Sequence, residues 1–139
     1  MTETQRQPEL MLQSEELFHL MVESAKDYAI FAMDTEGRVA SWNTGAERLF
    51  GYTEAEILGR KVSILFTPED RERGVPEQEL KTAKSLGQAD DGRWHLRKDG
   101  TRFRSSGMVR PLNDNTGNLR GFVPLRLQRF CLNFRYRLA

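Results

Sequence analysis

The side chains best suited to chemistry are few in this sequence, and they are scattered. It contains two histidines, His19 and His95, and one cysteine, Cys131, so no disulfide framework can form. No phosphate-binding loop, Cys-x-x-Cys pair, His-Glu-x-x-His helix or nucleophile motif occurs. Two adjacent acids, Asp90 and Asp91, stand in a loop. We therefore expect a binding or structural protein rather than an enzyme, with no metal site.

The composition is that of an ordinary soluble domain. The 139 residues suffice for one domain with a core, and 38% hydrophobic and 29% charged residues are a usual balance. The formal net charge of +1 predicts no general attraction to nucleic acid or a membrane surface. No apolar run reaches the roughly 18 residues of a membrane span, and the N-terminus lacks the regions of a signal peptide. We expect a cytoplasmic location.

The beginning of the chain predicts a leader followed by a helix. Residues 1–8 read as a disordered leader, and an amphipathic helix is expected over residues 9–25. Apolar side chains recur in it at helical spacing: Leu10, Leu17, Phe18, Met21, Val22 and Ala25. This stripe must be covered by the domain itself or by a second copy of the chain. The candidate dimer contacts are Leu10, Leu17, Phe18 and Met21.

Residues 26–66 show the signals of a hairpin followed by two very short helices. The stretch DYAIFAM reads as a strand buried on both faces, DTEG as a tight turn, and RVASWN as the partner strand. Asn43 or Thr44 can cap the first helix, which Gly51 ends. Thr53 and Glu56 form a capping box for the second helix.

The next segment predicts a longer helix and then strands. TPED begins the helix with Thr67 as its cap, Gly74 and Pro76 interrupt it, and it ends near residue 86. Three strands follow, the first two joined at Asp99-Gly100. Strands grouped at both ends of the chain predict one antiparallel sheet with the helices on one face, an α+β domain. Such an arrangement can leave a cavity for a small molecule.

Two stretches carry a family resemblance: W-N-x-x-A-E-x-L-F-G-Y at residues 42–52 and R-K-D-G-T-R-F at residues 97–103. With them, residues 15–123 resemble the PAS domain of bacterial sensor proteins, especially sensor histidine kinases. The resemblance implies a PAS fold over residues 26–123, with a five-stranded antiparallel sheet in the order 2-1-5-4-3. It also implies a sensory or dimerisation role upstream of an output domain, such as the kinase domain of a longer parent protein, which this chain lacks.

Two cofactor-binding subtypes of the family can be compared residue by residue. The flavin-binding members carry a reactive cysteine in G-R-N-C-R-F-L-Q, whereas the matching stretch here is GRKVSILF, with Val62 at the cysteine position. Lys61 and Phe66 replace the asparagine and the glutamine, so no thiol is there to form a flavin adduct. The haem-binding members supply an imidazole from the long helix, and residues 67–87 contain no histidine. The cofactor stays unknown, with both of these types disfavoured.

The resemblance also implies which residues line a ligand chamber, by register with the flavin-binding members. His95 has two readings: an imidazole satisfied by backbone or water, or a polar ligand anchor or pH-sensitive group. The apolar candidate residues also have two readings: they contact a ligand, or they simply pack in the hydrophobic core. The candidate chamber residues are Phe31, Met33, Leu65, His95, Phe103, Ser105 and Val123.

The last sixteen residues depart from the family pattern. PLRLQRFCLNFRYRLA, residues 124–139, contains four arginines and no acid, whereas the rest of the chain has 17 basic and 20 acidic residues. Family members instead continue into a short Asp-containing motif and a coiled coil. Pro124 also removes a ladder N–H, which is tolerated mainly at an edge or a bulge. This basic tail is either the natural ending of a free-standing sensor or an altered end of a longer kinase.

The sequence therefore predicts a cytoplasmic PAS sensory domain of a two-component signalling protein. It would bind a small ligand, form a homodimer through the helix at residues 9–25, or do both. The alternative is a ligand-free structural module for dimerisation or protein interaction, with a filled core. No nucleic-acid or membrane partner is expected.

Overall fold

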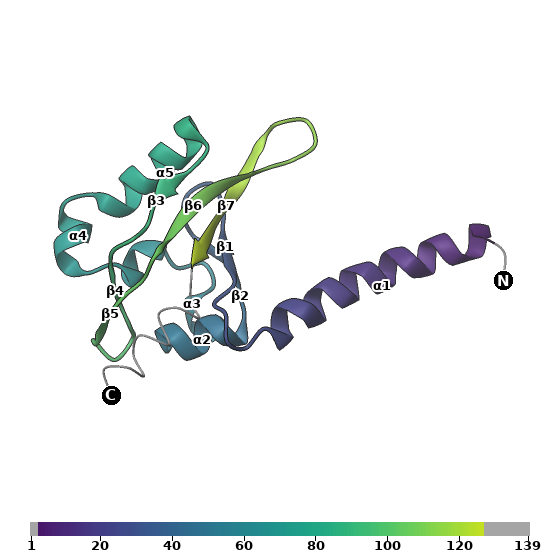
Figure 1. Cartoon of the computed structure of the whole chain (residues 1–139), viewed down its shortest axis with the longest axis horizontal. Helices are drawn as coiled ribbons and strands as arrows, with labels where there is room; N and C mark the ends of the chain where they lie inside the picture. The colour runs from purple at the N-terminus through teal and green to yellow at the C-terminus, as the bar shows by residue number, and fades with distance from the viewer. Residues whose placement is uncertain (1–2, 127–139) are drawn as a thin grey trace.

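The structure is an antiparallel sheet with helices on one face and a long N-terminal helix that points away from it (Figure 1). The computed structural model describes the backbone of residues 3–126 and the side chains of residues 14–125. The helices are α1 (Glu3–Ser24), α2 (Thr44–Phe50), α3 (Glu54–Ile57), the 3-10 helix η1 (Val62–Leu65), α4 (Pro68–Glu72) and α5 (Val75–Leu86). The strands are β1 (Phe31–Met33), β2 (Val39–Trp42), β3 (Ala89–Asp90), β4 (Trp94–Leu96), β5 (Arg102–Arg104), β6 (Gly107–Asn113) and β7 (Leu119–Arg126).

The main sheet has the order β2-β1-β7-β6-β3, and its neighbouring strands are antiparallel. This confirms the expected α+β class and order 2-1-5-4-3, because β7 is the fifth expected strand and the third and fourth are each divided in two. The outer parts, β4 and β5, form a separate two-stranded hairpin. The division falls where Asp91 donates its amide to Gly107 and Ser105 donates its amide to Arg93.

The short helices begin and end where the sequence signals stand. Asn43 caps α2, and Gly51 ends it in the left-handed region with φ 87°. The capping box of α3 is present, since the Thr53 and Glu56 side chains each accept from the other residue's amide. Thr67 caps α4 through its hydroxyl. These local hydrogen bonds let three brief helices turn the chain across one face of the sheet.

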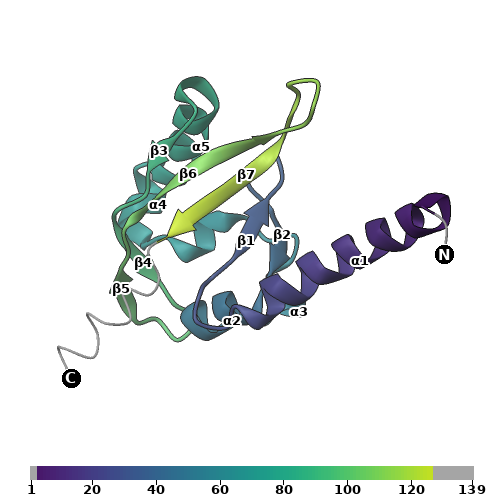
Figure 2. The same ribbon diagram turned by 45° about the vertical axis from the view of Figure 1, so that its right-hand side comes forward.

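The core fills the space between the sheet and these helices. One face of the sheet is buried there, whereas the other is partly open, and the helices lie behind it in Figure 2. The expectation that the first strand is buried on both faces is therefore wrong: Ile30 is 36% exposed and Ala32 is half-buried. No described element covers that outer face. The core side chains include Phe31, Met33, Val39, Trp42, Val109 and Phe122 from the sheet and Ala46, Leu49, Phe50, Ile57, Leu65 and Ala83 from the helices.

The N-terminal helix is longer than expected at its start. The helix predicted for residues 9–25 is α1, Glu3–Ser24, which takes in most of the segment expected to be a disordered leader. Glutamate, glutamine and arginine in that segment are good helix formers, so its polar composition does not prevent a helix. The side chain of Leu10 lies outside the described part of the chain.

Strand β7 includes the first residues of the expected basic tail. Pro124 pairs with Val109 of β6, whereas the pairing of β7 with β1 is the single pair of Met33 and Phe122. Pro124 has no amide hydrogen to donate, and β7 continues past this pair with β6 alone. Residues 127–139, with Cys131 and most of the expected tail, lie outside the described residues. Among the described helices, none is long and apolar enough to cross a membrane.

Candidate functional site

Most of the residues expected to line a chamber lie together in the core. They come from β1, from η1 and from the β4–β5 hairpin, which folds over the same face of the sheet. An isolated bridge between Phe66 and His95 joins the end of η1 to β4 and fixes this approach. Six of the seven are at most 5% exposed: Phe31, Met33, Leu65, His95, Phe103 and Ser105.

The seventh candidate, Val123, does not face this space. Phe122 is 2% exposed and is paired with the inward-facing Met33, so Phe122 takes the inward position on β7. Side chains alternate along a strand, and Val123 is accordingly half-buried on the outer face, opposite Arg110. The prediction was wrong by one residue, because a shift of one position moves a side chain to the other face of a sheet.

Aromatic rings pack against one another where the chamber was expected. The ring of Phe50 lies 5.9 Å from Phe31, 5.4 Å from Trp42 and 5.4 Å from Phe103, measured between centroids. His95 lies 6.0 Å from Phe103. These tilted and edge-to-face contacts are the favoured arrangements of aromatic pairs. Trp42 and Phe50 were not in the candidate set, although both belong to the motif at residues 42–52.

His95 has both ring nitrogens close to protein oxygens. Its Nδ1 lies 2.9 Å from the backbone carbonyl oxygen of Leu65, and its Nε2 lies 3.2 Å from Oδ1 of Asp91. Both His95 and Asp91 are fully buried. The geometry favours the reading in which the imidazole is satisfied by the protein, because a ligand would have to displace one of these oxygens to bind it.

Asp91 extends the polar contact from His95 toward α5. The Nε of Arg93 lies 3.6 Å from Oδ1 of Asp91 and donates to Oε1 of Glu79 at 2.5 Å. Glu79 is 6% exposed, whereas the Arg93 side chain is 24% exposed. We call Glu79, Asp91, Arg93 and His95 the buried ionic cluster.

Burial raises the pKa of Glu79 to about 9, and the negative charge of Asp91 acts in the same direction. The ion pair with Arg93 lowers the pKa of Glu79 and offsets only part of this rise. Sequence reasoning had placed Asp91 among the loop acids and had not singled out Glu79 or Arg93. No local signal could have found them, since the two carboxylates are twelve positions apart and meet only in the fold.

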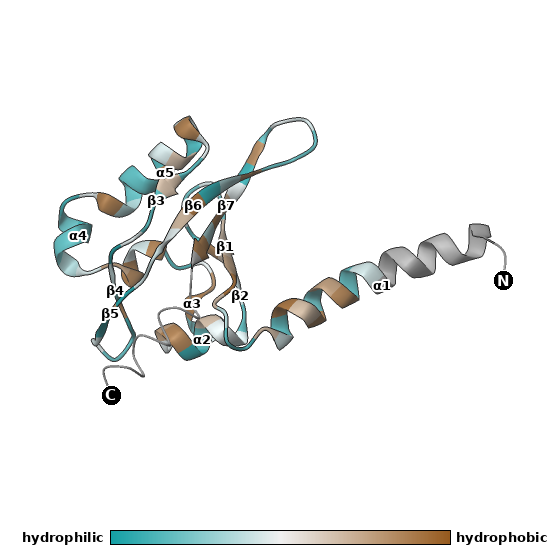
Figure 3. Ribbon diagram, in the orientation of Figure 1, coloured by the Kyte–Doolittle hydropathy of each residue, from teal (hydrophilic) through white to brown (hydrophobic). Residues whose placement is uncertain are grey.

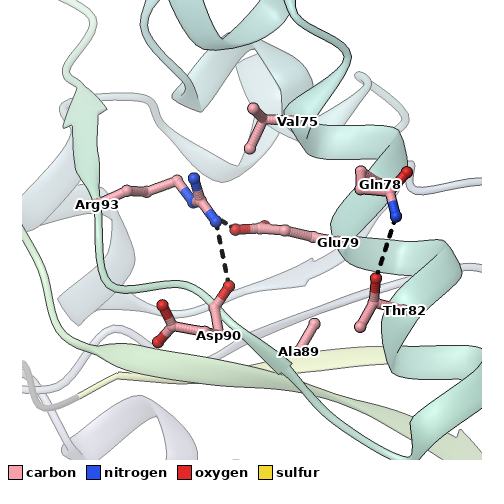
Figure 4. A pocket seen from close by; sticks show the side chains of 7 residues that line it. All are labelled: Val75, Gln78, Glu79, Thr82, Ala89, Asp90 and Arg93. Carbon is pink, nitrogen blue, oxygen red and sulfur yellow. Dashed lines mark hydrogen bonds and ion pairs between the residues drawn. The ribbon is translucent and has the colours of Figure 1, made fainter.

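Two clefts open on the surface near these groups. One, of about 220 Å³, lies between α5 and β3, and Figure 4 shows Arg93 pointing across it to Glu79. Its other lining side chains include Val75, Gln78 and Thr82. The second, of about 380 Å³, lies where the β4–β5 hairpin meets the end of α2 and is lined by Arg48, Phe50, Gly51, Arg97, Lys98 and Asp99. Within the described residues, no cluster of three or more His, Cys, Asp or Glu could hold a metal ion.

A family model described as the PAS fold matches residues 16–124. This span covers well over half of the chain and takes in the last turns of α1, the helices and almost the whole main sheet. The chain belongs to the PAS family. The resemblance drawn from the two sequence motifs is thereby confirmed.

Named relatives of this PAS domain are signalling proteins. It is 40% identical over 97 residues to two-component system protein A of Emericella nidulans. This match covers 70% of this chain and 14% of that protein. It is 42% identical over 45 residues to the sensor protein FixL of Bradyrhizobium diazoefficiens, covering 32% of this chain and 9% of that protein. The chain thus spans a small part of the length of these curated relatives.

The fold also matches a solved PAS domain. The PAS domain of a protein from Colwellia psychrerythraea superposes with a TM-score of 0.65 at 26% identity. The match covers 74% of this chain and 89% of that chain. Together with the two relatives, it places this chain among PAS sensory domains related to two-component proteins.

The donor set of this PAS domain does not fit either cofactor type considered above. Val62, which is buried in η1, stands at the position of the flavin-binding cysteine. Helix α5 contains no histidine, and His95 faces Leu65 and Asp91 with its two nitrogens. A flavin–cysteine adduct and a haem ligated from the long helix therefore both lack their protein ligand.

The apolar side of α1 is exposed in the single chain. Leu17 is 57% exposed, Phe18 69% and Met21 60%, and all three were predicted dimer contacts. Leu20, at 55%, adds to them and was not singled out from the sequence. In Figure 3 this apolar stretch lies on the half of α1 that is nearer the domain. Four neighbouring large apolar side chains on one helix are an unusual surface for a monomer.

Proposed function

We propose that this chain is the sensory PAS module of a longer two-component signalling protein and that it works as a dimer. Its input changes how two copies associate, and the association passes the signal to an output domain. The relatives named as a two-component system protein and a sensor protein support the signalling part of this proposal.

The main observation in favour of a dimer is the exposed apolar surface of α1. Leu17, Leu20 and Met21 are spaced at i, i+3 and i+4, so they lie along one side of the helix. Two such helices that pack against each other would remove these side chains from water, at roughly 25 cal/mol for each Å² of apolar surface buried. The outer face of the sheet offers a second apolar surface, with Ile30, Leu112 and Leu125 exposed on it.

The packed core favours a dimerisation module over a large permanent ligand chamber. Phe50 contacts Phe31, Trp42 and Phe103, so a ligand at that place would have to move these rings. Ligand binding is therefore secondary in the proposal and would require repacking. A native mass that exceeds the denatured mass of freshly purified protein would establish a co-purified ligand, whereas equal masses would support the ligand-free module.

Sedimentation velocity tests the dimer. Leu17→Glu and Met21→Glu would place charges in the α1 contact, so each variant is expected to sediment as a monomer at a concentration where the unmodified chain is a dimer. His19→Glu is the matched control, because His19 lies on the opposite side of α1 and is exposed. A monomeric unmodified chain, or variants that stay dimeric, would refute the α1 dimer.

The remaining parts of the proposal concern the parent protein. A histidine kinase output domain would lie in sequence beyond the PAS domain, as the small share of each relative covered by this chain suggests. A cytoplasmic location is proposed for this domain on its composition. Autophosphorylation of the parent protein, compared with and without Leu17→Glu, would test whether the dimer contact controls the output.

A further inference from the structure

The buried ionic cluster joins two elements of the domain that are far apart in sequence. Glu79 is on α5, and His95 is on β4 and reaches the carbonyl oxygen of Leu65 in η1. We infer that this cluster is a proton-operated latch: it holds α5 against β4 while it retains a shared proton and loosens when that proton leaves. This inference goes beyond the proposed dimer and does not depend on it.

The geometry of His95 shows that the cluster holds a proton. A carbonyl oxygen only accepts, so Nδ1 of His95 must carry the hydrogen that is donated to Leu65. A neutral imidazole would then present a lone pair on Nε2 to Oδ1 of Asp91, and two acceptors do not attract each other at 3.2 Å. The pair is consistent only with a proton between them, either on His95 as imidazolium or on Asp91 as carboxylic acid.

Charge balance explains why the folded chain keeps this proton. Arg93 is always cationic, so two ionised carboxylates and one guanidinium leave a net charge of −1 in a largely buried place. One proton, held between His95 and Asp91, makes the cluster neutral. An uncompensated buried charge is costly, and the raised pKa of Glu79, about 9, has the same physical origin.

The other charges around Glu79 do not neutralise the cluster. Asp90 of β3 lines the same cleft, and its carboxylate accepts from the amide of Gly92. On α5 itself, Glu77 and Lys81 are exposed. Three charged residues of α4 and β6, which pack against α5, make contacts elsewhere: Glu69 with Arg102, Asp70 with Arg73, and Arg110 with Met108. Arg71 and Glu72 of α4 are exposed.

Aromatic rings also pack around His95. Its ring lies 4.9 Å from Phe66 and 6.4 Å from Phe50, between centroids. Arg97 on the hairpin lies over the ring of Phe103 and donates to the carbonyl oxygen of Leu49. Arg93 is the cation of the cluster, and its partly exposed side chain lies in the cleft of Figure 4, through which protons can exchange with solvent.

The stability of the folded chain should therefore depend on pH above neutrality. In the unfolded chain the carboxylates are ionised and a free imidazole loses its proton near about 6.5. The folded cluster keeps its proton above that pH, because losing it would leave a buried net charge of −1. The folded state binds one more proton than the unfolded state in this window. Its stability therefore falls as pH rises, and the folding equilibrium constant drops about tenfold for each pH unit.

Urea unfolding at pH values above about 6.5 tests the proton count. Glu79→Gln makes the cluster neutral without the shared proton, so the tenfold drop for each pH unit is expected to disappear. Glu77→Gln, an exposed glutamate on the same helix, is the matched control and should keep the dependence. An unmodified chain with no such drop, or a Glu79→Gln variant that keeps it, would overturn the inference.

Two measurements on the unmodified chain keep the inference testable even if the Glu79→Gln variant does not fold. At pH 7.5, NMR should find either both ring nitrogens of His95 protonated or a protonated carboxyl on Asp91. A neutral His95 with Asp91 ionised would overturn the inference. The amides of α5 should also lose protection from hydrogen exchange relative to those of β1 as the pH is raised above neutrality, and unchanged relative protection would contradict the latch.

Discussion

The side-chain amide of Asn43 donates to the backbone carbonyl oxygen of Val22 at 3.0 Å and so ties the end of α1 to the start of α2. The same nitrogen reaches the carbonyl oxygen of Tyr28 at 2.9 Å. The side-chain oxygen accepts from the amides of Ile30 and Ala46, the latter as the cap of α2. One buried side chain thereby sets the position of α1 relative to the sheet, on which the proposed dimer depends.

Asn43→Ala should be one of the most destabilising substitutions at a polar position. It removes a helix cap, worth about 1 kcal/mol, and takes a hydrogen-bond partner from partly buried backbone groups of Val22, Tyr28 and Ile30, which adds to the loss. Asn43→Asp keeps the acceptor but removes the donor to Val22 and Tyr28, and it should preserve α2 while loosening α1. Urea denaturation and the circular dichroism of each variant would measure this; equal stability of Asn43→Ala and the unmodified chain would contradict the assignment.

Gly45 and Gly121 are positions where the backbone approaches too closely for a side chain. A Cβ at Gly45 would lie 1.8 Å from the carbonyl oxygen of Tyr28, and one at Gly121 would lie 2.1 Å from that of Met33. Each Gly→Ala variant should therefore lose about 1–3 kcal/mol or more of unfolding free energy. Gly92→Ala is the control, because its Cβ would meet only Asp90, at 3.4 Å. Denaturant midpoints that do not differ among the three variants would show that the close approaches are relieved cheaply.

The Ser105→Leu variant tests whether the space around Ser105 is a packed core or an open ligand chamber. Ser105 is 1% exposed at the break between the two parts of the hairpin, so a larger side chain should overpack the site and cost about 1–3 kcal/mol. Ser105→Ala, which adds no volume, serves as the control. A Ser105→Leu chain that is as stable as the unmodified chain would indicate an unfilled space and would restore the ligand chamber as the leading interpretation.

Glu56 should titrate well below the usual range of a glutamate. The hydrogen bond from Lys98, together with the capping bond from Thr53, lowers the pKa of Glu56 to about 2. A lowered folded pKa means that its stabilising effect is present above pH 4.5 and is lost as pH falls toward 2. NMR titration should show Lys98→Met moving the pKa of Glu56 upward, whereas Glu54→Gln should leave it in place. A pKa of Glu56 that does not respond to Lys98→Met would contradict this origin.

Local structure was predictable because its causes are local. The caps at Asn43, Thr53 and Thr67 and the stop at Gly51 each rest on residues within a few positions of one another. The sheet order could be predicted only through the family resemblance, since strand pairing joins residues as distant as Met33 and Phe122.

The sequence by itself determined the fold family, the class of the domain and the apolar side of α1, because motifs and periodicity lie along the chain. Only the tertiary structure decided that Phe122 rather than Val123 faces the core, since a register shift of one residue moves a side chain to the other face of the sheet. The tertiary structure also brought Glu79 to Arg93 and Asp91 to His95. These contacts depend on how α5 packs against the hairpin, and no spacing in the sequence specifies that approach.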